Sequence, residues 1–114
     1  MMDYSKFIKA ANKRIKKEEE IREVDIEDEF CNFAKTLGCI ALKLIILGLR
    51  GFPDRTVICP GGRIMFIEFK KPGDKPTHAQ SKWLRILRGL GFYATYFDNL
   101  NAAKSALEDF LNGL

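Results

Sequence analysis

Two acids and a lysine lie on either side of a short apolar hairpin signal. Asp54 follows Pro53, and Glu68 and Lys70 stand two residues apart further along the chain. Two carboxylates that converge on one point bind Mg²⁺ or Mn²⁺, and such an ion activates water against a phosphoryl group. A neighbouring lysine orients that water or offsets the charge that develops in the transition state. Glu-x-Lys alone is usually an ordinary surface pair, but Pro53-Asp54 at hairpin distance favours phosphodiester hydrolysis.

The elements around these residues read as two strands joined by a turn. Residues 56–59 and 64–67 are rich in β-branched and aromatic side chains, and Pro60-Gly61-Gly62 separates them. Side chains alternate between the faces of a strand, so Glu68 and Lys70 point the same way.

The length of the turn decides whether the two acids meet. A three-residue Pro60-Gly61-Gly62 loop with a bulge pairs Asp54 opposite Glu68 and brings both carboxylates to one face. A two-residue Gly61-Gly62 turn pairs Asp54 with Phe69 and turns the acids apart. We therefore expect the three-residue loop, or a bulge with the same effect.

At these residues the chain resembles a known family. Pro53-Asp54 with Glu68-x-Lys70 is similar to the PD-(D/E)xK nuclease motif. Longer strings resemble the virus-type replication-repair nuclease (VRR-NUC) domain, in particular its small stand-alone members typical of phages: Arg50-Gly51-Phe52-Pro53-Asp54-Arg55, Pro60-Gly61-Gly62-Arg63, Phe66-Ile67-Glu68-Phe69-Lys70-Lys71-Pro72-Gly73 and Gln80. The resemblance runs from about Glu27 to about Phe97.

The resemblance implies a restriction-endonuclease-like core and metal-dependent hydrolysis of DNA. It also implies a role for each matching residue. Asp54, Glu68 and the Phe69 carbonyl would bind Mg²⁺ or Mn²⁺, Lys70 would position water or stabilise charge, and Glu27 and Gln80 would support the metal or its waters.

Geometry alone does not decide which residue is the third acid of the predicted metal site. A helix predicted from Asp25 to Leu37 carries Glu27 and Glu29 on opposite borders of its apolar stripe. Aligning this helix with the leading helix of the family favours Glu27, which would reach the metal directly or through a water. The alternative for Glu27 is a first-turn acid favoured by the helix dipole.

Gln80 has two interpretations. Thr77-x-x-Gln80 before an apolar run is a capping box, in which the glutamine bonds back to the Thr77 N–H. Gln80 also matches the family's signature glutamine near the active site. Both interpretations stay open.

Basic residues cluster around and after the motif. We expect DNA-phosphate contacts from several of them, although a solvated helix face is the alternative for such a charge run. The candidates are Lys43, Arg50, Arg55, Lys71, Lys75 and Lys82.

The remaining elements complete an α/β fold. Cys39–Ile46 is a nearly continuous apolar run, which predicts a central strand buried on both faces, with Lys43 either snorkelling to the edge or reaching the scissile phosphate. A helix opens at Thr77, a strand covers Phe92–Phe97, and Asp98 or Asn99 caps a last helix. We expect a central mixed β-sheet flanked by helices, in the order αβββαβ with a C-terminal helix.

Length, charge and cysteine spacing limit the classes to which the protein can belong. The chain has 114 residues, a net charge of +4, and no apolar run long enough to cross a membrane. Its three cysteines lack CxxC spacing, which predicts buried thiols in an intracellular, cytoplasmic setting and excludes a zinc site. We divide the chain into a basic N-terminal arm or helix, residues 1–22, and a nuclease domain, residues 23–114.

Together these features predict a Mg²⁺- or Mn²⁺-dependent DNA endonuclease, selective for nicked, branched or four-way-junction DNA, and a homodimer that cuts two strands. The principal alternative is a non-catalytic DNA-binding or assembly module with a vestigial nuclease site. A purely structural α/β protein is the third hypothesis.

Overall fold

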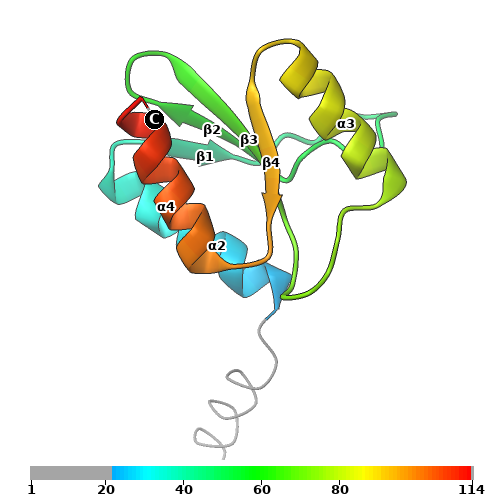
Figure 1. Ribbon diagram of the computed structural model, residues 1–114, viewed down its shortest axis with the longest axis horizontal. Coiled ribbons are helices and arrows are strands. Elements are labelled where there is room, and N and C mark those ends of the chain that lie inside the picture. The colour runs from blue at the N-terminus through cyan, green and yellow to red at the C-terminus, as the bar shows by residue number, and fades with distance from the viewer. Residues whose placement is uncertain (1–21, 114) are drawn as a thin grey trace, which may run out of the picture.

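The elements follow one another as the sequence predicts. The computed structural model describes residues 22–113 (Figure 1), so the predicted N-terminal arm lies outside the described part except for Arg22. Within that part no helix combines the length and the apolar character needed to cross a bilayer. The elements are α2 (Glu23–Thr36), β1 (Ile40–Leu42), β2 (Arg55–Cys59), β3 (Arg63–Phe69), α3 (His78–Gly89), β4 (Tyr93–Phe97) and α4 (Leu100–Leu111).

The four strands form one mixed sheet in the order β1-β2-β3-β4. The pairs β1–β2 and β2–β3 are antiparallel, and β3–β4 is parallel, because α3 carries the chain back between them. This α/β arrangement confirms the restriction-endonuclease-like core expected from the sequence.

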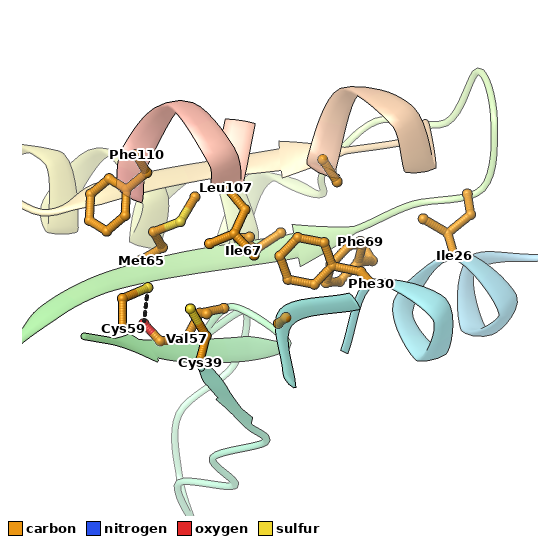
Figure 2. Packing of buried hydrophobic residues seen from close by; sticks show 12 residues of the cluster. Ile26, Phe30, Cys39, Val57, Cys59, Met65, Ile67, Phe69, Leu107 and Phe110 are labelled. Atoms are coloured by element: carbon orange, nitrogen blue, oxygen red, sulfur yellow. Dashed lines mark hydrogen bonds between the residues drawn. The ribbon is translucent and has the colours of Figure 1, made fainter. Parts of the chain in front are cut away.

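Helices cover the two faces of the sheet unequally. On one face α2 and α4 pack together over side chains such as Val57, Ile67 and Phe69, with the rings of Phe30 and Phe69 5.2 Å apart at the centre (Figure 2). On the other face α3 is the one helix of the described residues that packs over Phe66 and Ala94. Alternation of side chains along β2 and β3 separates these two cores.

The helices begin and end at signals in the sequence. The Asn99 side chain caps α4 by accepting a hydrogen bond from the Ala102 N–H at 2.9 Å. Gly38, with φ +78°, follows the end of α2. The start of α2 differs from the prediction, because the helix begins at Glu23 rather than at Asp25.

The prediction of a buried central strand at Cys39–Ile46 is wrong. Strand β1 covers only Ile40–Leu42, lies at the edge of the sheet, and exposes both Ile40 and Leu42. Residues 43–50 leave the sheet as an irregular segment. A continuous apolar run has the same pattern in a strand buried on both faces and in an uncovered strand. The sequence therefore could not show whether this strand would be buried.

Candidate active site

The β2–β3 hairpin brings Asp54 and Glu68 together. Cys59 pairs with Arg63 across a three-residue Pro60-Gly61-Gly62 loop, and the same register, continued past the pair Arg55–Ile67, sets Asp54 opposite Glu68. This confirms the predicted loop length. Both acids consequently lie on one face at the end of the hairpin that is far from its turn.

Backbone amides hold both carboxylates in place. The Asp54 N–H donates to Oε2 of Glu68 at 3.2 Å, and the Phe69 N–H donates to Oδ2 of Asp54 at 2.9 Å. Pro53 is fully buried next to Asp54. These reciprocal bonds fix the carboxylates before any ligand arrives, which is the pre-organisation that a metal or transition-state site requires.

The third acid at this point is Glu23. Ligand oxygens of Glu23, Asp54 and Glu68 all lie within 4.8 Å of one another. Glu23 is half-buried in the first turn of α2, one turn before the residue favoured from the sequence. Positions i and i+4 share a helix face, so Glu23 and Glu27 have the same phase, and that relationship was the signal that could have found Glu23.

Glu27 lies outside this acidic cluster. Its Oε1 accepts a hydrogen bond from Nε of Arg55 at 2.7 Å, and the carboxylate is buried. The Arg55 Nη1 also points to the Ala41 carbonyl at 3.4 Å. The structure thus pairs a predicted metal-supporting acid with a predicted phosphate-binding arginine, and the two side chains tie α2 to the start of β2. Glu29, the other acid weighed for the site, is exposed.

Burial and like charge act together on Glu68. The side chain is 1% exposed, and its desolvation, followed by the neighbouring Asp54 carboxylate, raises the pKa of Glu68 to about 8, against a smaller lowering by Lys70. Desolvation and the charge of Asp54 also raise the pKa of Glu23. The positive charge near the cluster therefore does not offset the negative charge of its carboxylates. A bound cation would relieve this imbalance.

Lys70 and Gln80 complete the surroundings of Glu68. The Lys70 Nζ lies 3.7 Å from Oε1 of Glu68, and the lysine is 8% exposed. The Gln80 Nε2 donates to that same Oε1 at 2.8 Å. Phe69, between the two motif residues in β3, turns its ring into the core.

Gln80 forms the capping box and also contacts Glu68. Its Oε1 accepts from the Thr77 N–H at 2.8 Å, and its own N–H donates to Oγ1 of Thr77 at 3.2 Å, so the predicted capping box is present. The amide nitrogen of the same side chain remains for Glu68. One glutamine therefore begins α3 and contacts the acidic cluster.

Gly51 lets the loop before Asp54 approach the start of α3. Its φ is +83°, and a Cβ built there would lie 2.6 Å from the carbonyl carbon of Ala79 and 2.7 Å from the backbone nitrogen of Gln80. No side chain fits in that space, so this position requires glycine both for its backbone conformation and for the close contact.

The cations predicted to contact phosphates differ in their exposure. Lys43, Arg50, Lys71, Lys75 and Lys82 are exposed, whereas Arg55 is engaged by Glu27. A shallow hollow of about 420 Å³ lies between α3 and β4, and its lining includes Lys75, Arg85, Arg88 and Tyr96 but no acid. Tyr96 pairs with Glu68 across β3 and β4, so the hollow adjoins the acidic cluster.

This donor set fits a hard divalent cation. Carboxylate oxygens are the ligands that Mg²⁺ and Mn²⁺ prefer, and three of them converge here, with the Asp54 and Glu68 carboxylates already oriented by hydrogen bonds. The lysine and the amide beside them suit a site in which negative charge develops on a substrate.

Comparisons with known proteins agree with this geometry. Residues 39–97 match the family model described as the VRR-NUC domain. The chain is similar to the protein named "Putative nuclease p44" of Acyrthosiphon pisum secondary endosymbiont phage 1, with 40% identity over 79 residues, 69% of this chain and 85% of that protein. It is also similar to a solved structure described as a VRR_NUC domain, with a TM-score of 0.72, 26% identity, and coverage of 77% of this chain and 96% of that one.

Proposed function

Since this chain belongs to the VRR-NUC domain family, which makes it a nuclease by fold and motif, we propose that it is a Mg²⁺- or Mn²⁺-dependent endonuclease that hydrolyses phosphodiester bonds in DNA. One observation carries the proposal: oxygens of Glu23, Asp54 and Glu68 converge within 4.8 Å, and Lys70 stands 3.7 Å from Glu68. An intact set of this kind argues against the alternative of a DNA-binding or assembly module with a vestigial site.

The metal would be held by Asp54, Glu68 and Glu23, with the Phe69 carbonyl as a further ligand and Glu27 acting only from outside the cluster. When bound, a divalent cation supplies Lewis-acid polarisation of a phosphoryl oxygen and a hydroxide near neutral pH. The hydrogen bonds from the Asp54 and Phe69 amides keep the two carboxylates in place while substrate binds.

Lys70 carries the positive charge nearest to the cluster. Because its ammonium is buried, little water competes for its protons, and it orients an attacking water or offsets the charge that grows on the phosphate. Gln80 fixes one oxygen of Glu68 through its amide, so that the other oxygen keeps a constant direction. Gln80 is thus a positioning residue.

DNA would bind through its backbone. The exposed side chains of Lys43, Arg50, Lys71 and Lys82 and the basic hollow at Lys75 contact phosphates beside the cleaved one. A domain of this size has little surface for reading bases, so we expect selectivity for DNA structure, such as nicks, branches or four-way junctions, in replication, repair or recombination. Cutting both strands of a junction calls for two sites, and we propose a homodimer for that reason.

The test is cleavage of supercoiled plasmid and of labelled four-way-junction DNA with Mg²⁺, with Mn²⁺ and with chelator. Wild type is compared with Glu68→Gln, Lys70→Ala and the control Glu29→Gln, which changes an exposed acid on α2. We expect metal-dependent cutting that is lost in the first two variants and kept in the control. DNA binding without cutting in the wild type, unchanged in the variants, would establish the non-catalytic module instead.

A further inference from the structure

The hollow between α3 and β4 is lined by groups of two kinds (Figure 1). Lys75, Arg85 and Arg88 supply exposed cations, while Tyr96 supplies an aromatic ring and Pro76 an apolar wall. We call it the α3–β4 hollow. Its volume of about 420 Å³ lies within the range of about 300–1,000 Å³ found for sites that hold one small ligand. A double helix is too wide to enter it.

Tyr96 is held by the core and still borders the hollow. The residue is half-buried and packs against the smaller core, which includes Phe66 and Leu84. Tyr93, three residues earlier in β4, lies on the opposite face of the sheet, where its ring is 5.5 Å from that of Phe110. A ring that the core already fixes loses little freedom when a nucleic-acid base stacks on it, so Tyr96 suits such stacking.

The cations of the hollow come from one face of α3 and from the loop before it. Arg85 and Arg88 are three residues apart on the helix and therefore share a face, and Lys75 precedes the helix. The Arg88 Nε donates to the Ala94 carbonyl, which fixes the direction of the guanidinium. Guanidinium groups bind phosphate oxygens. Phosphate-binding groups together with an aromatic ring are the composition that binds unpaired nucleotides.

The α3–β4 hollow adjoins the acidic cluster at two points. Tyr96 is the partner of Glu68 in the parallel pair β3–β4, so their side chains share a face and stand one strand spacing apart, about 4.8 Å. Ser81, which lines the hollow, follows Gln80, whose amide donates to Glu68. A DNA strand that is cut beside Glu68 therefore has a neighbouring nucleotide within reach of the hollow.

We propose that the α3–β4 hollow binds one unpaired nucleotide of the DNA substrate, next to the cleaved phosphate, with its base on Tyr96 and its phosphate at Arg85 and Arg88. This assignment rests on the proposed nuclease function. A paired base must first leave its partner and its stacked neighbours, whereas a base at a branch or bulge enters without that cost. Because every base has a π-face, the hollow selects DNA structure and reads no sequence.

The experiment is equilibrium binding of the full chain to fluorescein-labelled DNA, measured by anisotropy with chelator present so that no DNA is cut. Two duplexes are compared, each with one extra unpaired nucleotide in one strand. In the second duplex that nucleotide is abasic, so the two DNAs have equal length and charge and differ in one base. We expect the wild type to bind the first duplex at least about fivefold more tightly, which is the lower end of what stacking of one base contributes.

Four kinds of variant assign the preference to the hollow. Tyr96→Leu removes the ring and should abolish the preference, whereas Tyr96→Phe should keep it. Ser81→Leu narrows the hollow without removing a core side chain and should also abolish the preference, even if Tyr96→Leu does not fold. Tyr93→Leu is the matched control, an aromatic residue of the same strand on the opposite face. Arg85→Gln should weaken binding of both DNAs equally. Thermal unfolding checks the fold of each variant.

Each outcome decides the proposal. Equal binding of the two DNAs by the wild type overturns it, and so does a preference that survives in the folded Tyr96→Leu and Ser81→Leu variants. Competition by free dAMP at the concentration of the labelled DNA would make the hollow a site for a free nucleotide and would likewise overturn it. A wild type that shows the preference but cuts no DNA with Mg²⁺ or Mn²⁺ upholds the site for an unpaired nucleotide and rejects the nuclease function. Cutting without the preference does the reverse.

Discussion

Two buried glutamates lie close to the same end of the sheet and have opposite surroundings. Glu27 is 5% exposed and has an arginine, with Arg55 Nε 2.7 Å from its oxygen. Glu68 is 1% exposed and faces another carboxylate, with a lysine nitrogen only at 3.7 Å. Burial of an ionised carboxylate is costly in either place, but only Glu27 has a close guanidinium that offsets the cost.

The comparison distinguishes an acid that is paired within the fold from one that the proposed metal site would use. A buried carboxylate with a permanent partner needs nothing further. One that is crowded by a second carboxylate has a raised pKa, and a bound proton or cation stabilises it. Removing the charge of each acid in turn tests this distinction.

The largest effect should come from Glu68→Gln. We expect plasmid cleavage to fall at least about 10³-fold, because the variant removes one charge of the proposed metal site while the shape of the side chain is kept. The metal-free protein should at the same time become more stable near pH 7, because a neutral glutamine needs no proton in order to be buried beside Asp54. Cleavage rates and thermal unfolding on one preparation measure both. A variant that loses activity together with stability would show that Glu68 serves the fold, as Glu27 does.

A change of pH should show the effect of Glu68 on stability without a mutation. The pKa of Glu68 is about 8 in the folded protein against 4.5 as its ordinary value, so between these values the folded state holds a proton that the unfolded state has released. Metal-free stability should therefore fall as pH rises from 4.5 to 8, by about 3 kcal/mol at pH 7 relative to Glu68→Gln. Urea unfolding across this range with chelator measures the difference, and saturating Mg²⁺ should reverse it. Parallel curves for the two proteins would contradict the prediction.

Glu27→Gln should act on stability alone. It leaves the half-buried Arg55 guanidinium without its carboxylate, which should lower the free energy of unfolding by about 2 kcal/mol. Cleavage per folded molecule should stay within about tenfold of wild type, since Glu27 lies outside the acidic cluster. Urea unfolding and cleavage well below the midpoint give the two values. A loss of activity as large as that of Glu68→Gln would restore Glu27 as the helix acid of the site.

The effect of Glu23→Gln on cleavage should be smaller than that of Glu68→Gln. This half-buried acid is at the border of the cluster, so we expect a ten- to hundredfold loss of cleavage and a weaker affinity for Mn²⁺, with stability nearly unchanged. Glu29→Gln, on the same helix but exposed, is the matched control. Equal rates for the two variants, measured over a titration of metal, would remove Glu23 from the site.

Local signals in the sequence were sufficient for much of the site. The Pro60-Gly61-Gly62 loop determined that Asp54 stands opposite Glu68, and the Thr77-x-x-Gln80 pattern determined the start of α3. Both depend on interactions within a few residues or across one turn, which residue types encode directly.

The sequence pattern could not predict which turn of helix α2 would lie beside Asp54. It also could not predict which residues would be buried by elements distant in the chain. Helical phase placed Glu23 and Glu27 on one face, but only the packing of α2 on the sheet decided which turn reached Asp54. In the same way, the apolar run from Cys39 was compatible with a central strand. It is an exposed edge because nothing among the described residues covers it.

Gln80 is hydrogen-bonded both to Glu68 and to Thr77, so its amide signals can report on the acidic cluster. Its side-chain NH₂ donates to Glu68, while its carbonyl oxygen and backbone N–H close the cap of α3. A cation that draws charge from Glu68 weakens that donation and changes the amide resonances of one residue, along with the hydrogen-exchange rate at the Thr77 N–H. Occupancy of the acidic cluster can therefore be followed by NMR without any substrate, through a single amide group that a ¹⁵N label makes visible.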